Sequence, residues 1–312
     1  MKLLVALLTA VSTWASAQPV TRIVVPFAAG GVQDIVARSL NAELGTALGR
    51  SVIVENRAGA GGTIGAAYVA KSPPDGQTLI LAGASHTIAG SLYTKLAYHP
   101  LQDFSPIAHI GNVDYVLMIA AAVPAKTVAE FVAYGKANPG KLNYVSAGNG
   151  SATHLSMAYF VSQAGIDMVH VPYKATGEAV NEVLAGRAHA VIAANIGAIP
   201  FIKDPRVRAI GSTGTKRSKF LPELPTIDES GVPGYAFDSW IGILGPAGIP
   251  RATVEAINAA MARLLKDPVI LERLDKQGVV PRAMSADAFG ELLRADFAKM
   301  ARVVKLSGAR ID

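Results

Sequence analysis

Short apolar runs rich in β-branched residues alternate along the chain with segments whose apolar residues recur every three or four positions. The first kind of run is typical of a buried strand, and the second is typical of an amphipathic helix. Over the first hundred residues the two kinds take turns at residues 21–25, 36–48, 51–55, 64–71 and 78–82. This strand–helix–strand order predicts a parallel sheet with helices on its faces, so we expect an α/β protein.

The same alternation resumes after Pro100. Further strands are expected at residues 116–120, 143–146, 168–171 and 190–194, and further helices at residues 128–137, 152–164, 178–185, 251–265, 268–277 and 286–307. A chain of 312 residues is long enough for two domains with separate cores. We therefore expect one α/β domain from residues 18–101 and 222–312 and a second from residues 102–221, with crossings near Leu101 and Pro222.

The N-terminal residues have the features of a secretory signal peptide. Lys2 precedes an apolar run at residues 3–11, and the triplet Ala15-Ser16-Ala17 is an A-x-A-type cleavage site. The run is too short to cross a membrane, which takes about 20 apolar residues. The chain also has no Cys to carry a lipid anchor. We expect residues 1–17 to be removed and the protein to be a soluble monomer in the periplasm.

Composition and motif content exclude several classes of function. Without Cys there is no thiol nucleophile, disulfide or Cys-ligated metal site. The 29 basic and 23 acidic residues are scattered, so the net charge of +6 forms no basic cluster for nucleic acid. No serine-hydrolase elbow, phosphate-binding loop or zinc-protease helix motif occurs, and the six His residues lack metal-ligand spacing. We expect a binding protein with no cofactor and no catalysis.

Three glycine-rich turns each join a predicted strand to a predicted helix, at residues 26–31, 58–65 and 147–151. Backbone N–H groups at helix N-termini attract anions. The glycine spacing of the second turn is one residue too long for a dinucleotide fingerprint. Any single turn can be a simple strand–helix connection. All three follow the carboxyl ends of strands, two in one domain and one in the other, which predicts a ligand cleft between the domains.

Further candidate contacts lie beside these turns and at other strand ends. Ser85 and His86 follow the third predicted strand, and Asn195 follows the strand at residues 190–194. His154 lies one turn into the helix that begins after Ser151. A single His is more often structural than functional, and Ser151 is also a good helix N-cap. These residues are candidates because their loops are expected to face the cleft.

Six ordered motifs extend from near the signal peptide to the C-terminal region: PFAAGGVQD at residues 26–34, VENRAGAGG at 54–62, NPGKL at 138–142, GNGS with the following HL at 148–155, HVPYK at 170–174, and W with G and PAGIP at 240–250. In these motifs the chain resembles the Bug family, the extracytoplasmic solute-binding proteins of tripartite tricarboxylate transporters. The resemblance implies a type II periplasmic-binding-protein fold, in which two α/β domains close on a small organic anion.

The resemblance also implies how the ligand is held. One carboxylate would be bound by the first two glycine-rich turns, largely through backbone groups and ordered waters, and the other end of the ligand would meet the second domain. Phe27 and Trp240 would form apolar walls, although Trp240 can equally pack in the core. The candidate ligand-binding residues are Phe27, Ala29, Gly30, Gly31, Asp34, Gly61, Gly62, Ser85, His86, Gly148, Asn149, Ser151, His154, Asn195 and Trp240.

Some residues leave alternatives open. Asp34, in the first turn of a helix, either stabilises the helix dipole or meets a ligand ammonium group. Ala175 replaces a Gly that is usual in the family, Glu178 replaces a Pro and His189 replaces an acidic residue. These departures leave the distal group of the ligand open. We expect a periplasmic carboxylate-binding protein that serves a tripartite tricarboxylate transporter; a ligand-sensing subunit of a signalling system and an exported α/β enzyme are the alternatives.

Overall fold

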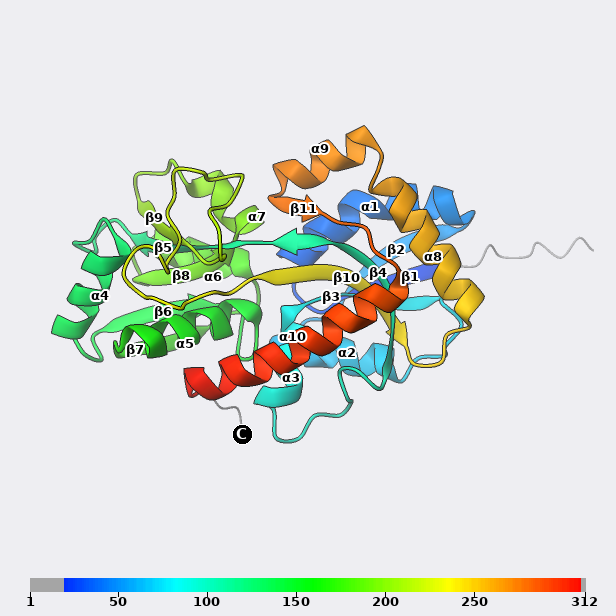
Figure 1. Cartoon of the computed structure of the whole chain (residues 1–312), viewed down its shortest axis with the longest axis horizontal. Coiled ribbons are helices and arrows are strands. Elements are labelled where there is room, and N and C mark those ends of the chain that lie inside the picture. The colour runs from blue at the N-terminus through cyan, green and yellow to red at the C-terminus, as the bar shows by residue number, and fades with distance from the viewer. Residues whose placement is uncertain (1–19, 310–312) are drawn as a thin grey trace, which may run out of the picture.

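The structure is a computed structural model that describes residues 20–309, so the expected signal peptide lies outside the described residues. Two separate sheets form the framework (Figure 1). One has six strands in the order β11-β4-β10-β3-β1-β2, and the other has five in the order β7-β6-β8-β5-β9. Helices surround both sheets, which confirms the predicted α/β class.

Both the N-terminal and C-terminal parts of the chain build the six-stranded sheet. Its strands are β1 (Val20–Val25), β2 (Ser51–Asn56), β3 (Thr78–Gly83), β4 (Phe104–Val113), β10 (Ser239–Pro246) and β11 (Val279–Pro281). The accompanying helices are α1 (Val32–Leu48), η1 (Ala60–Gly62), α2 (Thr63–Ala70), α3 (Ala84–Leu92), α8 (Arg251–Leu264), α9 (Pro268–Lys276) and α10 (Ala286–Ser307). The three N-terminal strands are parallel, as predicted, but β10 runs antiparallel to both neighbours and makes the sheet mixed.

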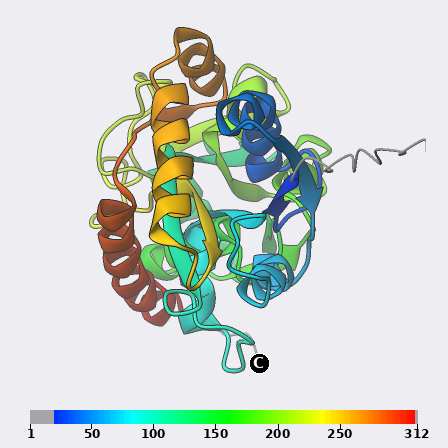
Figure 2. The same cartoon turned by 90° about the vertical axis from the view of Figure 1, so that its right-hand side faces the viewer.

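Alternate residues of the central strands enter two different apolar cores. Ile23 and Leu79 pack with residues of α1 and α8, whereas Val24 and Ile80 pack with residues of α2 and α10. Successive side chains of a strand point to opposite faces of a sheet, so helices are needed on both faces. Helices α1 and α8 lie side by side over one face (Figure 2).

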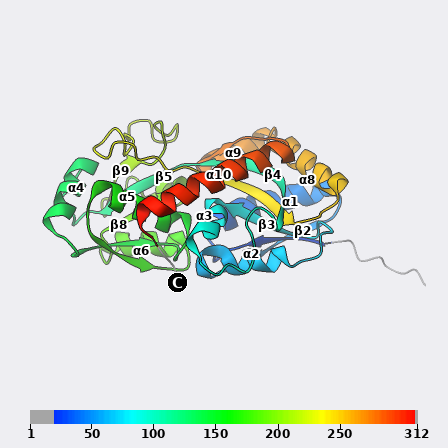
Figure 3. The same ribbon diagram turned by 60° about the horizontal axis from the view of Figure 1, so that its bottom comes forward.

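The middle of the chain builds the five-stranded sheet. Its elements are β5 (Tyr115–Ala120), α4 (Val128–Ala137), β6 (Leu142–Ser146), α5 (Ala152–Ala164), β7 (Met168–Pro172), α6 (Thr176–Leu184), β8 (Ala190–Ala194), α7 (Asn195–Ala198), η2 (Ile199–Phe201) and β9 (Val207–Ser212). The C-terminal helix α10 contacts both α3 and α5, so it joins the two halves of the molecule (Figure 3). None of the helices in residues 20–309 is long and apolar enough to span a membrane.

The chain changes sheets at places other than those expected. Strand β4 pairs with β10 and β11, so the residues after Leu101 still belong to the six-stranded sheet. The first crossing is at Asp114, directly between β4 and β5, and the return after Pro222 reaches the six-stranded sheet at Ser239. We propose that each sheet with its helices is one domain, with the first boundary moved to Asp114.

Several elements are absent from the sequence-based prediction, notably α3, β4, β9, β10 and β11. Glycine interrupts the strand pattern of β10 because its neighbours leave no space for a side chain; a Cβ at Gly242 would lie 2.4 Å from the Phe289 ring. Pro106 similarly weakens the pattern of β4. Helix α3 is buried along most of its length, so it lacks the polar face on which a periodicity argument depends.

Candidate functional site

A small cavity lies between the two halves of the molecule. The six-stranded half contributes Phe27, Gly31, Val32, Gln33 and Ser85, and the five-stranded half contributes Tyr115, Ala147, Ser151, Ala152, Thr153, Thr176 and Ala194. The cavity volume is about 20 Å³, which is room for about one water molecule. A larger ligand can therefore enter only if the two halves move apart.

Four helices direct their N-terminal residues to this cavity: α1 and α3 from one half, and α5 and α6 from the other. The first N–H groups of a helix lack intrahelical partners and carry partial positive charge. The N-cap residues of α1 and α6, Gly31 and Ala175, provide no side-chain cap to satisfy those groups. None of the described residues that line the cavity is charged. The backbone alone thus makes both walls suitable for an anion.

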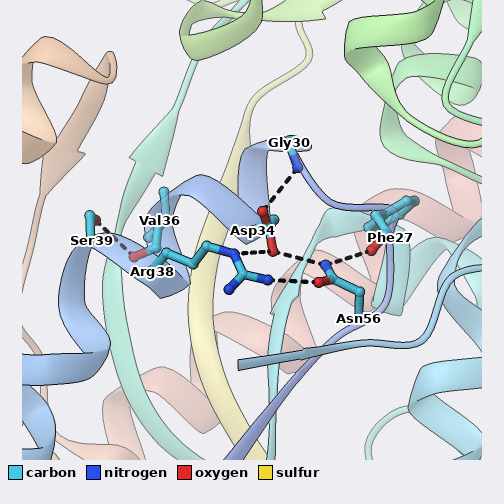
Figure 4. A network of polar contacts seen from close by, with 7 residues as sticks. All are labelled: Phe27, Gly30, Asp34, Val36, Arg38, Ser39 and Asn56. Atoms are coloured by element: carbon cyan, nitrogen blue, oxygen red, sulfur yellow. Dashed lines mark hydrogen bonds and ion pairs between the residues drawn. The ribbon is translucent and has the colours of Figure 1, made fainter. Parts of the chain in front are cut away.

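Asp34 fixes the first glycine-rich turn to its own half of the molecule (Figure 4). One carboxylate oxygen accepts a hydrogen bond from the backbone N–H of Gly30, at 2.9 Å, and the other accepts from Arg38 Nε and Asn56 Nδ2, each at 2.9 Å. Asn56 also donates to the carbonyl of Phe27 at 3.0 Å. Asp34 is buried but does not line the cavity. Of the two expected roles, the structure favours the structural one.

The electrostatics of Asp34 agree with this role. Burial raises the pKa of the Asp34 carboxyl, but the hydrogen bonds from Arg38, Gly30 and Asn56 outweigh burial and hold the pKa below its usual value of 3.8. The stabilisation from the charged carboxylate is therefore fully present above pH 3.8 and is lost as the pH falls through the lowered pKa. Asp34 is an ionised anchor at neutral pH.

We expect Asp34→Asn to destabilise the protein by about 2 kcal/mol, because one oxygen would become an NH2 group that faces existing donors. The free energy of unfolding in urea measures this cost. Asp287→Asn is a matched control, since Asp287 pairs with Arg251 and its side chain is 75% exposed, and such pairs contribute little. Equal stability of the two variants would contradict an anchoring role for Asp34.

The second glycine-rich turn borders a smaller cavity of about 10 Å³, which Gly61, Gly62, Ser85 and His86 line together with Phe27. The Nε2 atom of His86 lies 2.8 Å from the carbonyl of Pro100, so this nitrogen carries the ring proton. The Nδ1 atom is buried and has no hydrogen-bond partner among the described residues. Burial lowers the pKa of His86 to about 4, so the ring is neutral at pH 7.

The second and third glycine-rich turns touch each other across the two halves. The hydroxyl of Tyr93 lies 2.8 Å from the carbonyl oxygen of Ala60 and 3.1 Å from that of Asn149. Gly61 approaches so closely that an added Cβ would lie 2.2 Å from the same Asn149 oxygen. The turns therefore form a contact that exists only when the halves are close together.

Ser85 and Ser151 both serve the N-terminus of α5. The hydroxyl of Ser151 accepts a hydrogen bond from the backbone N–H of His154 at 3.2 Å, which confirms the N-cap geometry. Ser85, from the other half, accepts from the backbone N–H of Ala152 at 3.0 Å. Ser85 keeps a hydroxyl proton that can be donated, whereas the hydroxyl of Ser151 also lies 3.0 Å from that of Thr153. Both side chains line the main cavity.

A family model described as the tripartite tricarboxylate transporter family receptor matches residues 36–309. The chain belongs to this family. The protein BugT of Bordetella pertussis is 32% identical to this receptor over 301 residues, which cover 95% of the chain and 91% of BugT. The family model describes a transporter receptor, and the solved neighbours include proteins with a bound ligand, so this receptor is a binding protein and not an enzyme.

Solved structures agree with the family assignment. Rpa4515 of R. palustris with adipate superposes on the receptor with a TM-score of 0.89 and 32% identity, covering 96% of this chain and all of that one. The periplasmic binding protein BugD gives a TM-score of 0.87 at 33% identity over 93% of this chain and 98% of its own. MatC from Rhodopseudomonas palustris with bound malate gives 0.86 at 32% identity, covering 91% and 98% of the two chains. The expected periplasmic-binding-protein fold is thereby confirmed.

The structure brings together some of the candidate residues of the receptor and separates others. Phe27, Gly31, Ser85 and Ser151 line the main cavity, and Gly61, Gly62 and His86 line the smaller one beside it. Ala29 and Gly30 lie at the exposed tip of the first turn. Gly148 and Asn149 belong to the third turn but line neither of these two cavities.

Trp240 and Asn195 pack away from both cavities. The indole of Trp240 lies in the core against Phe289 and donates to the Asp296 carboxylate at 2.9 Å. Asn195 is fully buried, donates from Nδ2 to Ser218 at 3.2 Å, and packs beside Gly278. The structure therefore favours the core-packing role of Trp240 and gives Asn195 a place at the contact between the two halves.

His154 also lies outside both cavities. Its ring stacks on His170 with 4.0 Å between centroids, and His170 stacks on Tyr144. The Nδ1 atom of His154 accepts a hydrogen bond from the N–H of Gly150 at 3.2 Å, so this histidine shapes the third glycine-rich turn. Burial lowers the pKa of His154 to about 4 and, with the neighbouring ring, that of His170 to about 3.

The residues that depart from the family pattern do not line the main cavity either. Ala175 is the N-cap of α6. Glu178 accepts a hydrogen bond from the backbone N–H of Lys174 at 3.0 Å, and His189 is bonded to Asn143. Any effect of these departures on the ligand is therefore indirect.

Four cavity residues with polar side chains have no counterpart among the sequence-based candidates: Gln33, Tyr115, Thr153 and Thr176. Gln33 and Thr153 lie beside residues of the first and third glycine motifs, whereas Tyr115 and Thr176 begin β5 and α6 with no such motif beside them. The shared feature is the second position of a helix that faces the cleft, which the predicted start of the first helix at residue 36 concealed for Gln33. Gln33 and Thr153 both occupy that position.

Proposed function

We propose that the receptor captures a small organic carboxylate between its two halves and closes on it. The observation that carries this proposal is the pair of uncapped helix N-termini, α1 on one wall and α6 on the other, at a cavity lined by uncharged residues. Such N–H groups bind carboxylate oxygens strongly without a buried cation. The related structures with adipate and malate contain ligands of this class.

The wider role follows from the family. We propose that the chain is exported by its N-terminal signal sequence, that residues 1–17 are removed, and that the mature protein is a monomer that delivers its ligand to the membrane components of a tripartite tricarboxylate transporter. Deletion of the gene should then abolish uptake of the ligand. Recovery of uncleaved protein in the membrane fraction would contradict the proposed export.

The decisive experiment is a ligand screen on the mature protein, residues 18–312. We expect at least one mono-, di- or tricarboxylate to bind and to stabilise the fold by about 2.7 kcal/mol at a concentration of 100 times its Kd. Thermal melting identifies the ligand, and isothermal titration calorimetry measures its Kd. Neutral amides of the same acids are the matched controls. The proposal fails if the amides bind as well as the acids, or if no carboxylate binds.

A further inference from the structure

Gln33 and Thr176 face the main cavity from opposite walls and have unused hydrogen-bonding groups. Gln33 is the second residue of α1, and Thr176 is the first residue of α6. Neither side chain makes a hydrogen bond to any other of the described residues, whereas Ser85, Ser151 and Thr153 all do. Both groups are therefore free to meet a ligand, and both are uncharged.

No acidic side chain faces the same space. Asp34 and Asp114 each stand next to a cavity-lining residue in the sequence. The two oxygens of Asp34 are directed at Gly30, Arg38 and Asn56 (Figure 4), and the carboxyl group of Asp114 is hydrogen-bonded to Ser218. Among the cavity-lining residues that the structure describes there is neither Asp nor Glu. An ammonium group enclosed here would thus find only neutral acceptors.

The helix N-termini further disfavour the binding of an ammonium group in this cavity. The N–H groups of α1 and α6 carry partial positive charge and face the cavity from both sides. A buried cation without an anionic partner pays a large desolvation cost. A ligand that carries only carboxylates or hydroxyls meets no such cost. The helix N-termini favour its carboxylates, and the side chains of Gln33 and Thr176 can form hydrogen bonds with its hydroxyls.

We propose that the receptor selects carboxylates without an amino group over their amino-acid analogues, and that Gln33 sets this selectivity. The inference rests on the proposed carboxylate-binding function and names a substrate class within it. Among the residues that line the cavity, Gln33 can be replaced by a side chain of the same shape that carries a negative charge, namely Glu. Gln33→Glu should therefore give an ammonium group the partner that the natural cavity lacks.

The test uses pairs of acids that differ by one amino group: succinate with L-aspartate, and glutarate with L-glutamate. Isothermal titration calorimetry on the mature protein should show that, in every pair that binds, the acid without the amino group binds at least about tenfold tighter. In Gln33→Glu this ratio should fall by at least about tenfold, since the new carboxylate repels the anion and attracts the ammonium group.

The variant is chosen to keep the fold intact, because a negative charge in the first turn of a helix is favourable. Gln163→Glu is the matched control: Gln163 is exposed on α5, so the same change in net charge is made outside the cavity, and the ratio should not move. Gln33→Leu serves as a second variant. It should weaken binding of the acid without the amino group and leave its amino-acid partner no better bound.

Distinct results overturn the inference and the proposed function. If the wild-type receptor binds L-aspartate or L-glutamate as tightly as the matched acid, the inference is wrong and the carboxylate-binding function stands. If Gln33→Glu changes both members of a pair equally, Gln33 does not set the selectivity. If neither pair nor any other carboxylate binds, the proposed function fails and the inference fails with it.

Discussion

Replacing Gly61 with alanine should weaken ligand binding on the order of a hundredfold, which corresponds to about 2.7 kcal/mol. Gly61 has a φ of +62°, a conformation that costs other residues about 1 kcal/mol. The larger effect is steric, because the added Cβ would lie 2.2 Å from the carbonyl oxygen of Asn149 on the opposite half. Since the two turns meet only when the halves approach, the clash acts on the closed state.

The matched control is Gly49→Ala. Gly49 has a φ of +64° at the C-terminus of α1, and an added Cβ there meets no atom within 4 Å. The two variants thus share the backbone penalty and differ in the clash. Calorimetry with the ligand identified by the screen should give near-native affinity for Gly49→Ala and weak binding for Gly61→Ala. Equal affinities would mean that the contact between the turns is not part of the bound state.

The glycine-rich turns are the part of this site that could be predicted from the sequence. The turns that begin at Pro26, Ala58 and Ala147 follow the carboxyl ends of strands, so their approach to one cleft could be predicted before the structure was known. The structure brings the second and third into direct contact through Gly61 and Asn149. This part of the prediction depended only on local patterns and on the geometry of α/β sheets.

Residues whose partners are distant in the sequence could not be assigned in this way. Trp240 donates to Asp296, and Asn195 packs on Gly278, so each is fixed by a segment more than fifty residues away. An aromatic or amide side chain beside a strand end has the same local pattern whether it meets a ligand or the core. The first crossing between the sheets was expected near Leu101 for a related reason, because β4 is recognised as a strand through its pairing with β10 and β11.

Gln33 is a different case, because it lies inside a recognised glycine motif and was still not selected as a candidate ligand-binding residue. It stands between Gly31 and Asp34 in the first motif, and Asp34 drew attention as the charged residue. The hydrogen bonds of Asp34 show that this charge is used inside the fold. The neutral neighbour is then the side chain that is available to a ligand.

Lowering the pH from 7 toward 5 should destabilise the receptor steeply. Burial lowers the pKa of His86 and of His154 to about 4 and that of His170 to about 3, whereas an unfolded histidine has a pKa near 6.5. Below pH 6.5 the unfolded chain therefore binds more protons at these rings than the folded chain does, so the stability falls with the pH. Each ring contributes up to about 1.4 kcal/mol per pH unit in this range.

His86 and His154 together contribute about 2.5 kcal/mol per pH unit around pH 5.5, which is a large part of the stability of an ordinary domain. His170 is only partly buried and adds less, and His109 acts in the same direction because burial lowers its pKa as well. Asp114 and Asp296 act in the opposite direction, because burial raises their pKa values, so these carboxyls bind protons at a higher pH in the folded state than in the unfolded state.

Urea unfolding between pH 8 and pH 5 measures the net change in the free energy of unfolding. The histidine contribution should vanish above pH 7.5, where the rings are neutral in both states. His154→Phe keeps an aromatic ring against His170 and removes one titrating group, so its stability should depend on pH less steeply than that of the wild type. A wild-type stability that stays constant down to pH 5 would contradict the assignment of neutral rings to His86, His154 and His170.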